Sequence, residues 1–140
     1  MNVVVDASVA LKWFIGDQPN EQDVDRALSL LSAIEAGRVR LIQPIHWLIE
    51  VLAVAVRVRP AFAAETYSKL TQIPSEIATE DAVFLRAAEL SGRLKQHLFD
   101  SLYHAVALQR GATLITADER YYGAAAQEGA VQRLSDFNAV

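Results

Sequence analysis

The sequence predicts an α/β fold: a three-layer α/β/α sandwich with a central, mainly parallel sheet of four or five strands. Two observations lead to this prediction. Short apolar runs typical of strands alternate with stretches of helical periodicity, and strands separated by helices pair in parallel through right-handed crossovers. Hydrophobic residues make up 52% of the 140 residues, which favours a sheet that is covered on both faces.

The expected elements follow in order along the chain. Val3–Val5 is a β-branched run without a polar face, which indicates a central strand. Further strands are expected at residues 39–42, 76–78, 113–115 and 131–134, and helices at residues 7–14, 21–36, 44–58, 61–71, 79–94, 101–110 and 117–126, with a loop at 16–20. Asp6 or Ser8 would cap the first helix, Pro44 suits a first helical turn, and Gly111 suits a helix end.

Composition limits the class of protein. The length fits a single domain spanning residues 1–140. There is no cysteine, no apolar run long enough to span a bilayer and no recognisable signal peptide. We therefore expect a cytoplasmic protein that does not associate with a membrane. The net charge of −4 is unusual for a protein that binds nucleic acid through a broad basic face. An acidic pocket for metal ions with a local basic rim is compatible with it.

Four acidic residues stand where a solvated surface acid is not expected. Asp6 and Asp118 each follow an apolar strand, and the carboxyl ends of parallel strands are where open α/β sheets bind ligands. Glu50 lies in a helix that is apolar almost all round, and Asp100 lies where another apolar helix begins. Burying a lone carboxylate is costly, so these side chains should face a cation, a partner or a wet pocket.

Each acid also has a simpler interpretation. Asp6, Asp100 and Asp118 could be helix caps, and Glu50 could pair with His46 one turn earlier on the same helix. The case for a shared site therefore depends on all four together. Carboxylates gathered in one pocket repel one another unless cations neutralise them. Oxygen ligands without cysteine or paired histidines favour Mg²⁺ or Mn²⁺ over zinc.

These segments carry a resemblance to a known family. Val-Val-Asp-Ala-Ser around Asp6, Ile-Glu-Val around Glu50, Phe-Asp-Ser-Leu-Tyr-His around Asp100 and Leu-Ile-Thr-Ala-Asp ending at Asp118 resemble the acidic motifs of PIN-domain nucleases. In order and spacing the whole chain resembles the VapC toxins of toxin–antitoxin (VapBC) pairs. The resemblance implies a metal-dependent endoribonuclease that cuts RNA, a homodimer, and a small VapB-like antitoxin that blocks the site.

Carried over position by position, the resemblance assigns a role to six residues. Asp6, Glu50, Asp100 and Asp118 match the metal-binding and catalytic acids of the family, and Ser8 and Thr116 match its supporting pocket hydroxyls. One departure is His104, where many relatives carry an aliphatic residue; we expect it to be a surface or packing residue and not a ligand.

Two basic residues are candidates for contact with RNA phosphates. Arg120 is only two residues from Asp118, and Lys12 lies in the first predicted helix. Three other functions stay open. A receiver-type phosphoacceptor domain would need adjacent acids after the first strand, and Asp6 stands alone. The others are a non-catalytic PIN-like binding module and a PIN nuclease that acts on DNA or processes RNA.

Overall fold

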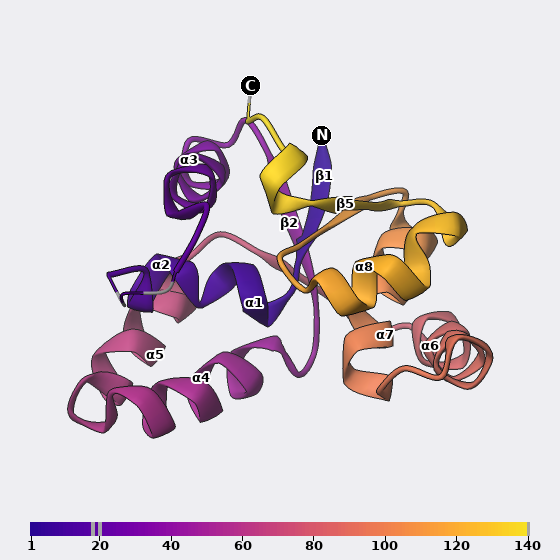
Figure 1. Cartoon of the computed structure of the whole chain (residues 1–140), viewed down its shortest axis with the longest axis horizontal. Coiled ribbons are helices and arrows are strands. Elements are labelled where there is room, and N and C mark those ends of the chain that lie inside the picture. The colour runs from indigo at the N-terminus through magenta and orange to yellow at the C-terminus, as the bar shows by residue number, and fades with distance from the viewer. Residues whose placement is uncertain (18, 20, 140) are drawn as a thin grey trace.

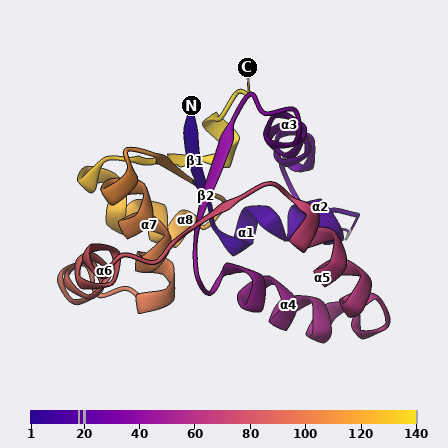
Figure 2. The same cartoon turned by 180° about the vertical axis from the view of Figure 1, so that it is seen from behind.

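The computed structural model describes residues 1–17, 19 and 21–139, so Gln18 and Asn20 of the predicted loop lie outside the described residues. Five parallel strands form one sheet in the order β3-β2-β1-β4-β5. Helices α1 to α5 lie on one side of the sheet and α6 to α8 lie on the other (Figures 1 and 2). The predicted three-layer sandwich is therefore confirmed, with five strands.

The strands are β1 (Asn2–Val5), β2 (Arg40–Pro44), β3 (Glu76–Ala78), β4 (Thr113–Thr116) and β5 (Val131–Arg133). The helices are α1 (Ala7–Ala10), α2 (Lys12–Ile15), α3 (Val24–Glu35), α4 (Trp47–Val58), α5 (Ala63–Gln72), α6 (Asp81–Leu94), α7 (Leu98–Arg110) and α8 (Glu119–Ala125). Short 3₁₀ helices are η1 (Pro60–Phe62), η2 (Ala126–Glu128) and η3 (Leu134–Asp136). None of the described helices has both the length and the apolar character that a membrane crossing requires.

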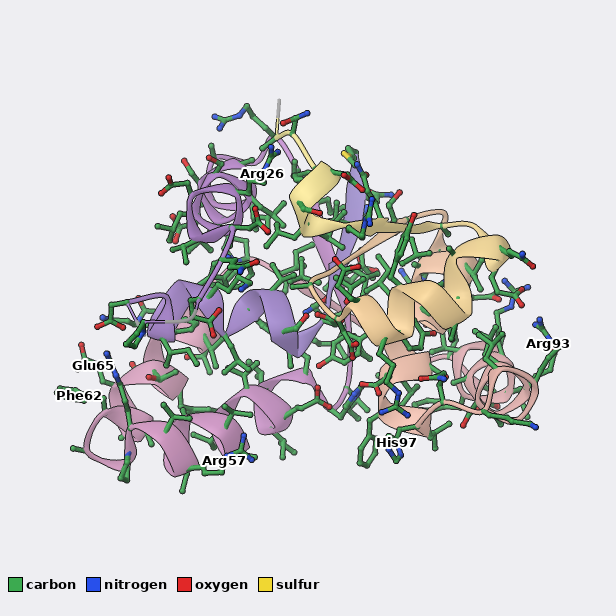
Figure 3. All side chains as sticks on the ribbon, viewed as in Figure 1. Arg26, Arg57, Phe62, Glu65, Arg93 and His97 are labelled. Carbon is green, nitrogen blue, oxygen red and sulfur yellow. The ribbon has the colours of Figure 1, made fainter. Side chains whose placement is uncertain are left out.

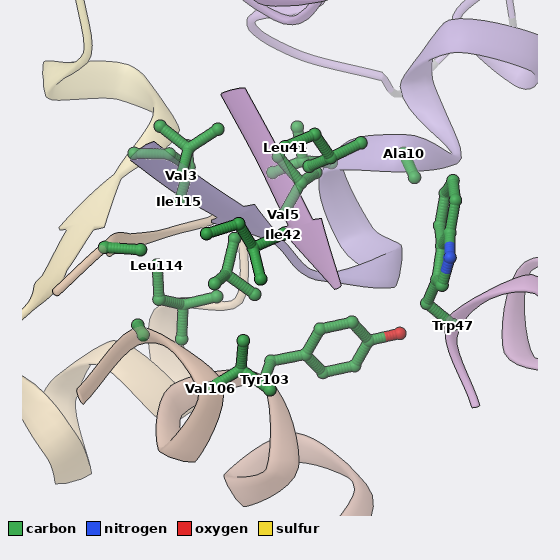
Figure 4. Close-up of a cluster of buried hydrophobic side chains, with 14 of the residues drawn as sticks. Val3, Val5, Ala10, Leu41, Ile42, Trp47, Tyr103, Val106, Leu114 and Ile115 are labelled. Carbon is green, nitrogen blue, oxygen red and sulfur yellow. The ribbon is translucent and has the colours of Figure 1, made fainter. Parts of the chain in front are cut away.

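The core lies on both faces of β1. Val3, Val4 and Val5 are fully buried, as expected of a central strand. Tyr103 and Val106 of α7 pack from one side of the sheet, whereas α1 and α4 pack from the other (Figure 4). Because β1 is enclosed on both faces, the backbone of Asp6, the residue that follows it, is held in place.

Near the end of β1, a side chain of β2 hydrogen-bonds to the backbone of β1. The amide of Gln43 accepts a hydrogen bond from Val5 N–H at 2.9 Å and donates one to Val5 C=O at 2.8 Å. Gln43 is fully buried, and the two bonds satisfy both polar groups of the Val5 backbone. They therefore hold the end of β1, one residue before Asp6.

Several predicted boundaries are wrong, although each predicted element exists. Pro44 ends strand β2 instead of opening a helix, which a proline tolerates at a strand terminus because it needs no donor there. The first predicted helix is divided at Leu11 into α1 and α2. Helix α7 begins at Leu98, three residues earlier than predicted, so Asp100 lies inside its first turn. Gly111 ends α7 in the left-handed conformation, as expected.

Candidate functional site

The sheet order places a topological switch point between β1 and β4. The chain leaves β1 towards β2 on one side, and it leaves β4 towards β5 on the other. Open α/β sheets form their ligand crevices at such a point, beyond the carboxyl ends of the strands. Asp6 and Asp118 follow these two strands, and the Asp6 N–H donates to Ile115 C=O across them. The structure thus places two of the predicted acids at the switch point.

Asp6 is held by two hydroxyls. Ser8 Oγ donates to Asp6 Oδ1, and Thr116 Oγ1 donates to Asp6 Oδ2. Each hydroxyl also accepts a backbone N–H at 3.0 Å, Ser8 from Ala117 and Thr116 from Asp118. Asp6 occupies the N-cap position of α1, which confirms one of the two predicted caps, but its side chain makes no capping bond and is engaged by the two hydroxyls instead.

Burial dominates the electrostatics of Asp6. It raises the pKa of this carboxyl to about 6, against the lowering effect of the Ser8 and Thr116 hydrogen bonds, and the negative charge of Asp118 adds to the rise. At neutral pH the side chain is still a carboxylate, but its environment in the protein disfavours the negative charge.

Asp118 and Asp100 come from different helices. Asp118 is the N-cap of α8, where its Oδ1 accepts the Tyr121 N–H at 3.0 Å, so the capping interpretation is confirmed for this residue. Asp100 makes no capping bond in α7. Burial raises the pKa of Asp100, and the negative charges of Glu50 and Asp118 raise it further. The structure therefore brings Asp6, Asp118, Asp100 and Glu50 into one electrostatic group.

Glu50 is tied to its surroundings by two aromatic side chains. His46 Nε2 lies 3.4 Å from Glu50 Oε2 and 3.0 Å from the Phe99 carbonyl, which confirms the predicted His46–Glu50 pair. The Tyr103 hydroxyl donates to Glu50 Oε1 at 3.4 Å. Sequence reasoning missed Tyr103, although its position three residues after Asp100 places it near the same face of α7.

The family is settled by a match along most of the chain. Residues 3–127 match the model of the PIN domain family. This chain belongs to the PIN domain family.

Solved structures share the fold of this PIN domain at low identity. They include VapBC-1 from nontypeable Haemophilus influenzae (15% identity, TM-score 0.65, 97% of this chain and 100% of that chain). VapBC2 from Rickettsia felis, bound to a DNA fragment from their promoter, is 14% identical (TM-score 0.68, 95% and 98% of the two chains). VapC20 from Mycobacterium tuberculosis, described as a sarcin–ricin loop cleaving toxin, is 19% identical (TM-score 0.65, 87% and 94%). No curated protein gives a significant match.

The donor set of this PIN domain suits a hard divalent ion, but its side chains are not gathered as a finished ligand shell. Among the described residues, no three histidine, aspartate or glutamate side chains lie close enough to hold one ion. The four acids offer only oxygen donors, the type that Mg²⁺ and Mn²⁺ prefer. The hydrogen bonds of the described residues include none to the Asp100 carboxylate, in contrast to Asp6 and Asp118.

The two candidate phosphate contacts differ in their surroundings. Lys12 is buried and its Nζ donates to Glu21 at 2.6 Å. Arg120 is exposed at the start of α8, close to Asp118 along the chain. A role of either residue in binding substrate stays a prediction. His97 is exposed in the turn before α7 (Figure 3), whereas His104 is a buried packing residue, as expected.

The raised pKa of Asp6 predicts that its charge destabilises the metal-free protein. The folded state binds a proton at Asp6 up to about pH 6, and the unfolded state only up to about pH 4, so the penalty grows as pH rises through this window. In EDTA at pH 7.5, we expect Asp6→Asn to raise the free energy of unfolding by about 3 kcal/mol at most. Urea unfolding measures it.

The same experiment at pH 4.5 provides the internal control, because most of the penalty is absent there. The Asp25→Asn variant removes an exposed acid from the first turn of α3 and should lower the stability by about 1 kcal/mol at most, the opposite direction to Asp6→Asn. Equal stabilities of wild type and Asp6→Asn at pH 7.5 would show that Asp6 is not disfavoured as a carboxylate.

Proposed function

We propose that this PIN domain is a metal-dependent endoribonuclease and the toxin of a toxin–antitoxin pair. The observation that carries the proposal is the pair Asp6 and Asp118 at the switch point of the sheet, together with Asp100 and Glu50 on the neighbouring helices α7 and α4. Burial raises the pKa of Asp6 and of Asp100, and the charge of Asp118 raises both further. A site of this kind favours a bound cation over an empty pocket. The fold shared with VapC20, a sarcin–ricin loop cleaving toxin, supports RNA as the substrate.

Three acids would hold Mg²⁺ or Mn²⁺ in this proposal. Asp6, Asp100 and Asp118 would bind it directly or through waters, and Glu50 would complete the shell or help to hold a second ion. When bound, such an ion makes a water nucleophilic at neutral pH and offsets charge at phosphorus. Hydrolysis would form a bond from the water oxygen to phosphorus and break the bond from phosphorus to the 3′ oxygen. The water would give up a proton and the leaving 3′ oxygen would take one up, which leaves 5′-phosphate and 3′-hydroxyl ends.

The remaining side chains of the site fix the acids in place. Ser8 and Thr116 each donate to one oxygen of Asp6, so both hydroxyls hold the carboxylate in one orientation. Tyr103 does the same for Glu50. Arg120 is exposed beside Asp118 and would contact an RNA phosphate. Lys12 would do so only by leaving its ion pair with Glu21.

Removing one acid should abolish cleavage without unfolding the protein. We expect Asp6→Asn and Asp100→Asn to cut structured RNAs at least about 100-fold more slowly than wild type in Mg²⁺, because a neutral amide is a poor ligand for a hard cation. Asp25→Asn should cut at the wild-type rate. A denaturing gel with Mg²⁺ and with EDTA reads cleavage sites and metal dependence together.

Three outcomes would contradict the proposal. If the purified Asp6→Asn and Asp100→Asn variants cut RNA at the wild-type rate, these residues are not part of the catalytic site. Cleavage of DNA in place of RNA would favour another PIN nuclease. Binding of RNA without cleavage under any metal condition would favour the non-catalytic module.

Exposed apolar side chains support the homodimer and the antitoxin as partners. Ile49 and Val56 are exposed and lie seven residues apart on one face of α4, and exposed Ile45 precedes this helix. We assign this face to a second copy of the chain. A separate cavity of about 440 Å³ between α2, α3 and α5, with Trp13 and Phe62 in its lining, would receive a segment of the antitoxin. Phe62 lies at the outer end of the α4–α5 pair (Figure 3).

The dimer face can be tested with one charge. Ile49 is 70% exposed on α4 and Leu85 is 72% exposed on α6, on the opposite side of the sheet. We expect Ile49→Glu to halve the molar mass measured by light scattering, because an unpaired carboxylate would be buried in the interface. Leu85→Glu should leave it unchanged. A monomeric wild type would refute the dimer, and a dimeric Ile49→Glu variant would refute this choice of face.

A further inference from the structure

Helices α7 and α8 each present one acid of the site near their N-terminal ends. Asp100 lies in the first turn of α7, and Asp118 caps α8. His104 follows Asp100 by four residues, so both lie near the same face of α7. Tyr121 follows Asp118 by three residues and donates its backbone N–H to the Asp118 carboxylate. His104 and Tyr121 are thus one turn away from the two acids.

The side chains of His104 and Tyr121 join the two helices. His104 Nδ1 lies 3.0 Å from the Tyr121 hydroxyl, and His104 Nε2 lies 2.8 Å from Gly129 C=O. Because a carbonyl only accepts, Nε2 carries the proton and Nδ1 accepts the Tyr121 O–H. The rings meet edge to face with centroids 5.8 Å apart. His104 is 0% exposed and Tyr121 is 2% exposed, so water does not compete for these bonds.

The larger packing contacts of the two helices are with different parts of the fold. Helix α7 packs against β1, β2, β4 and α6, whereas α8 packs against β5 and η2. Asp118 is also placed by β4, because its N–H donates to Thr116 Oγ1. The Tyr121–His104 hydrogen bond adds a direct link between α7, which carries Asp100, and α8, which Asp118 caps.

We propose that the Tyr121–His104 hydrogen bond fixes the separation of Asp100 and Asp118 and so sets the affinity of the acidic site for a divalent ion. Both are positioning residues, because neither touches the ion or the substrate. The inference rests on the proposed function in taking these acids as ion ligands. It explains the buried histidine at a position where the sequence resemblance leads us to expect an aliphatic residue.

The test compares Mn²⁺ affinity, measured by titration calorimetry, with thermal stability. We expect Tyr121→Phe to weaken Mn²⁺ binding roughly 3- to 10-fold, somewhat less than removal of a residue that contacts a ligand directly. Tyr122→Phe is the matched control, because it removes the same hydroxyl from the next residue of α8, whose ring contacts Arg133 instead. It should bind Mn²⁺ as wild type does.

Two variants of His104 separate positioning from stability. In His104→Asn, the amide oxygen replaces Nδ1 as acceptor for Tyr121, but the donor to Gly129 is lost. In His104→Gln, the amide nitrogen can replace Nε2 at Gly129, but no acceptor remains at the δ position. We expect both to lower Tm, whereas only His104→Gln weakens Mn²⁺ binding as Tyr121→Phe does.

The inference is overturned if Tyr121→Phe binds Mn²⁺ as tightly as Tyr122→Phe, or if affinity simply follows Tm in all variants. The contact would then serve folding alone, and the proposed nuclease would be untouched. Failure of the wild-type protein to bind Mn²⁺ would contradict the proposed metal site itself, and the inference with it.

Discussion

Mutual repulsion among carboxylates at one edge of the sheet is the constraint on which the rest of the site depends. Asp6 sits at the end of a fully buried strand, and its pKa of about 6 reflects burial and the neighbouring Asp118. Burial also raises the pKa of Asp100, and the charges of Glu50 and Asp118 raise it further. A sequence selected for stability alone would not keep Asp6 and Asp100 in these places, because a carboxyl whose pKa rises on folding costs free energy when it is ionised. Their retention in one place is understandable if a cation offsets them.

The fold opposes this repulsion with rigid supports. Strand β1 is enclosed on both faces, and the Gln43 amide fixes its last residue before Asp6. Hydroxyls of Ser8 and Thr116 then hold the Asp6 carboxylate. These supports come from α1, β2 and β4, so two of the three elements that set the geometry at Asp6 are distant in sequence. Preorganised groups of this type lower the cost of assembling a charged site on binding.

Sequence patterns predicted the features that depend on local order. The β-branched run Val3–Val5 identified the central strand, and the parallel topology then placed Asp6 and Asp118 at one edge. The His46–Glu50 pair followed from helical spacing. Whether the side chain of an N-cap acid makes a capping bond was not predictable, since that of Asp118 does so and that of Asp6 does not. The difference lies in tertiary contacts, because Asp6 is engaged by a hydroxyl from β4.

Other features could not be predicted because they depend on packing between segments. Gln43 lies one residue beyond the predicted strand at residues 39–42, and only its hydrogen bonds to Val5 reveal its role. Tyr103 and His104 lie in an apolar helix whose pattern does not show which partners satisfy their polar atoms. The boundary at Pro44 was wrong because proline suits both a first helical turn and a strand end.

The most direct test of the account is a crystal structure of the protein with Mn²⁺, measured at an X-ray wavelength that gives anomalous scattering from manganese. The account predicts an anomalous peak between Asp6, Asp100 and Asp118, with the Asp100 carboxylate turned towards the other two. A peak elsewhere, or none at a saturating concentration of Mn²⁺, would contradict it.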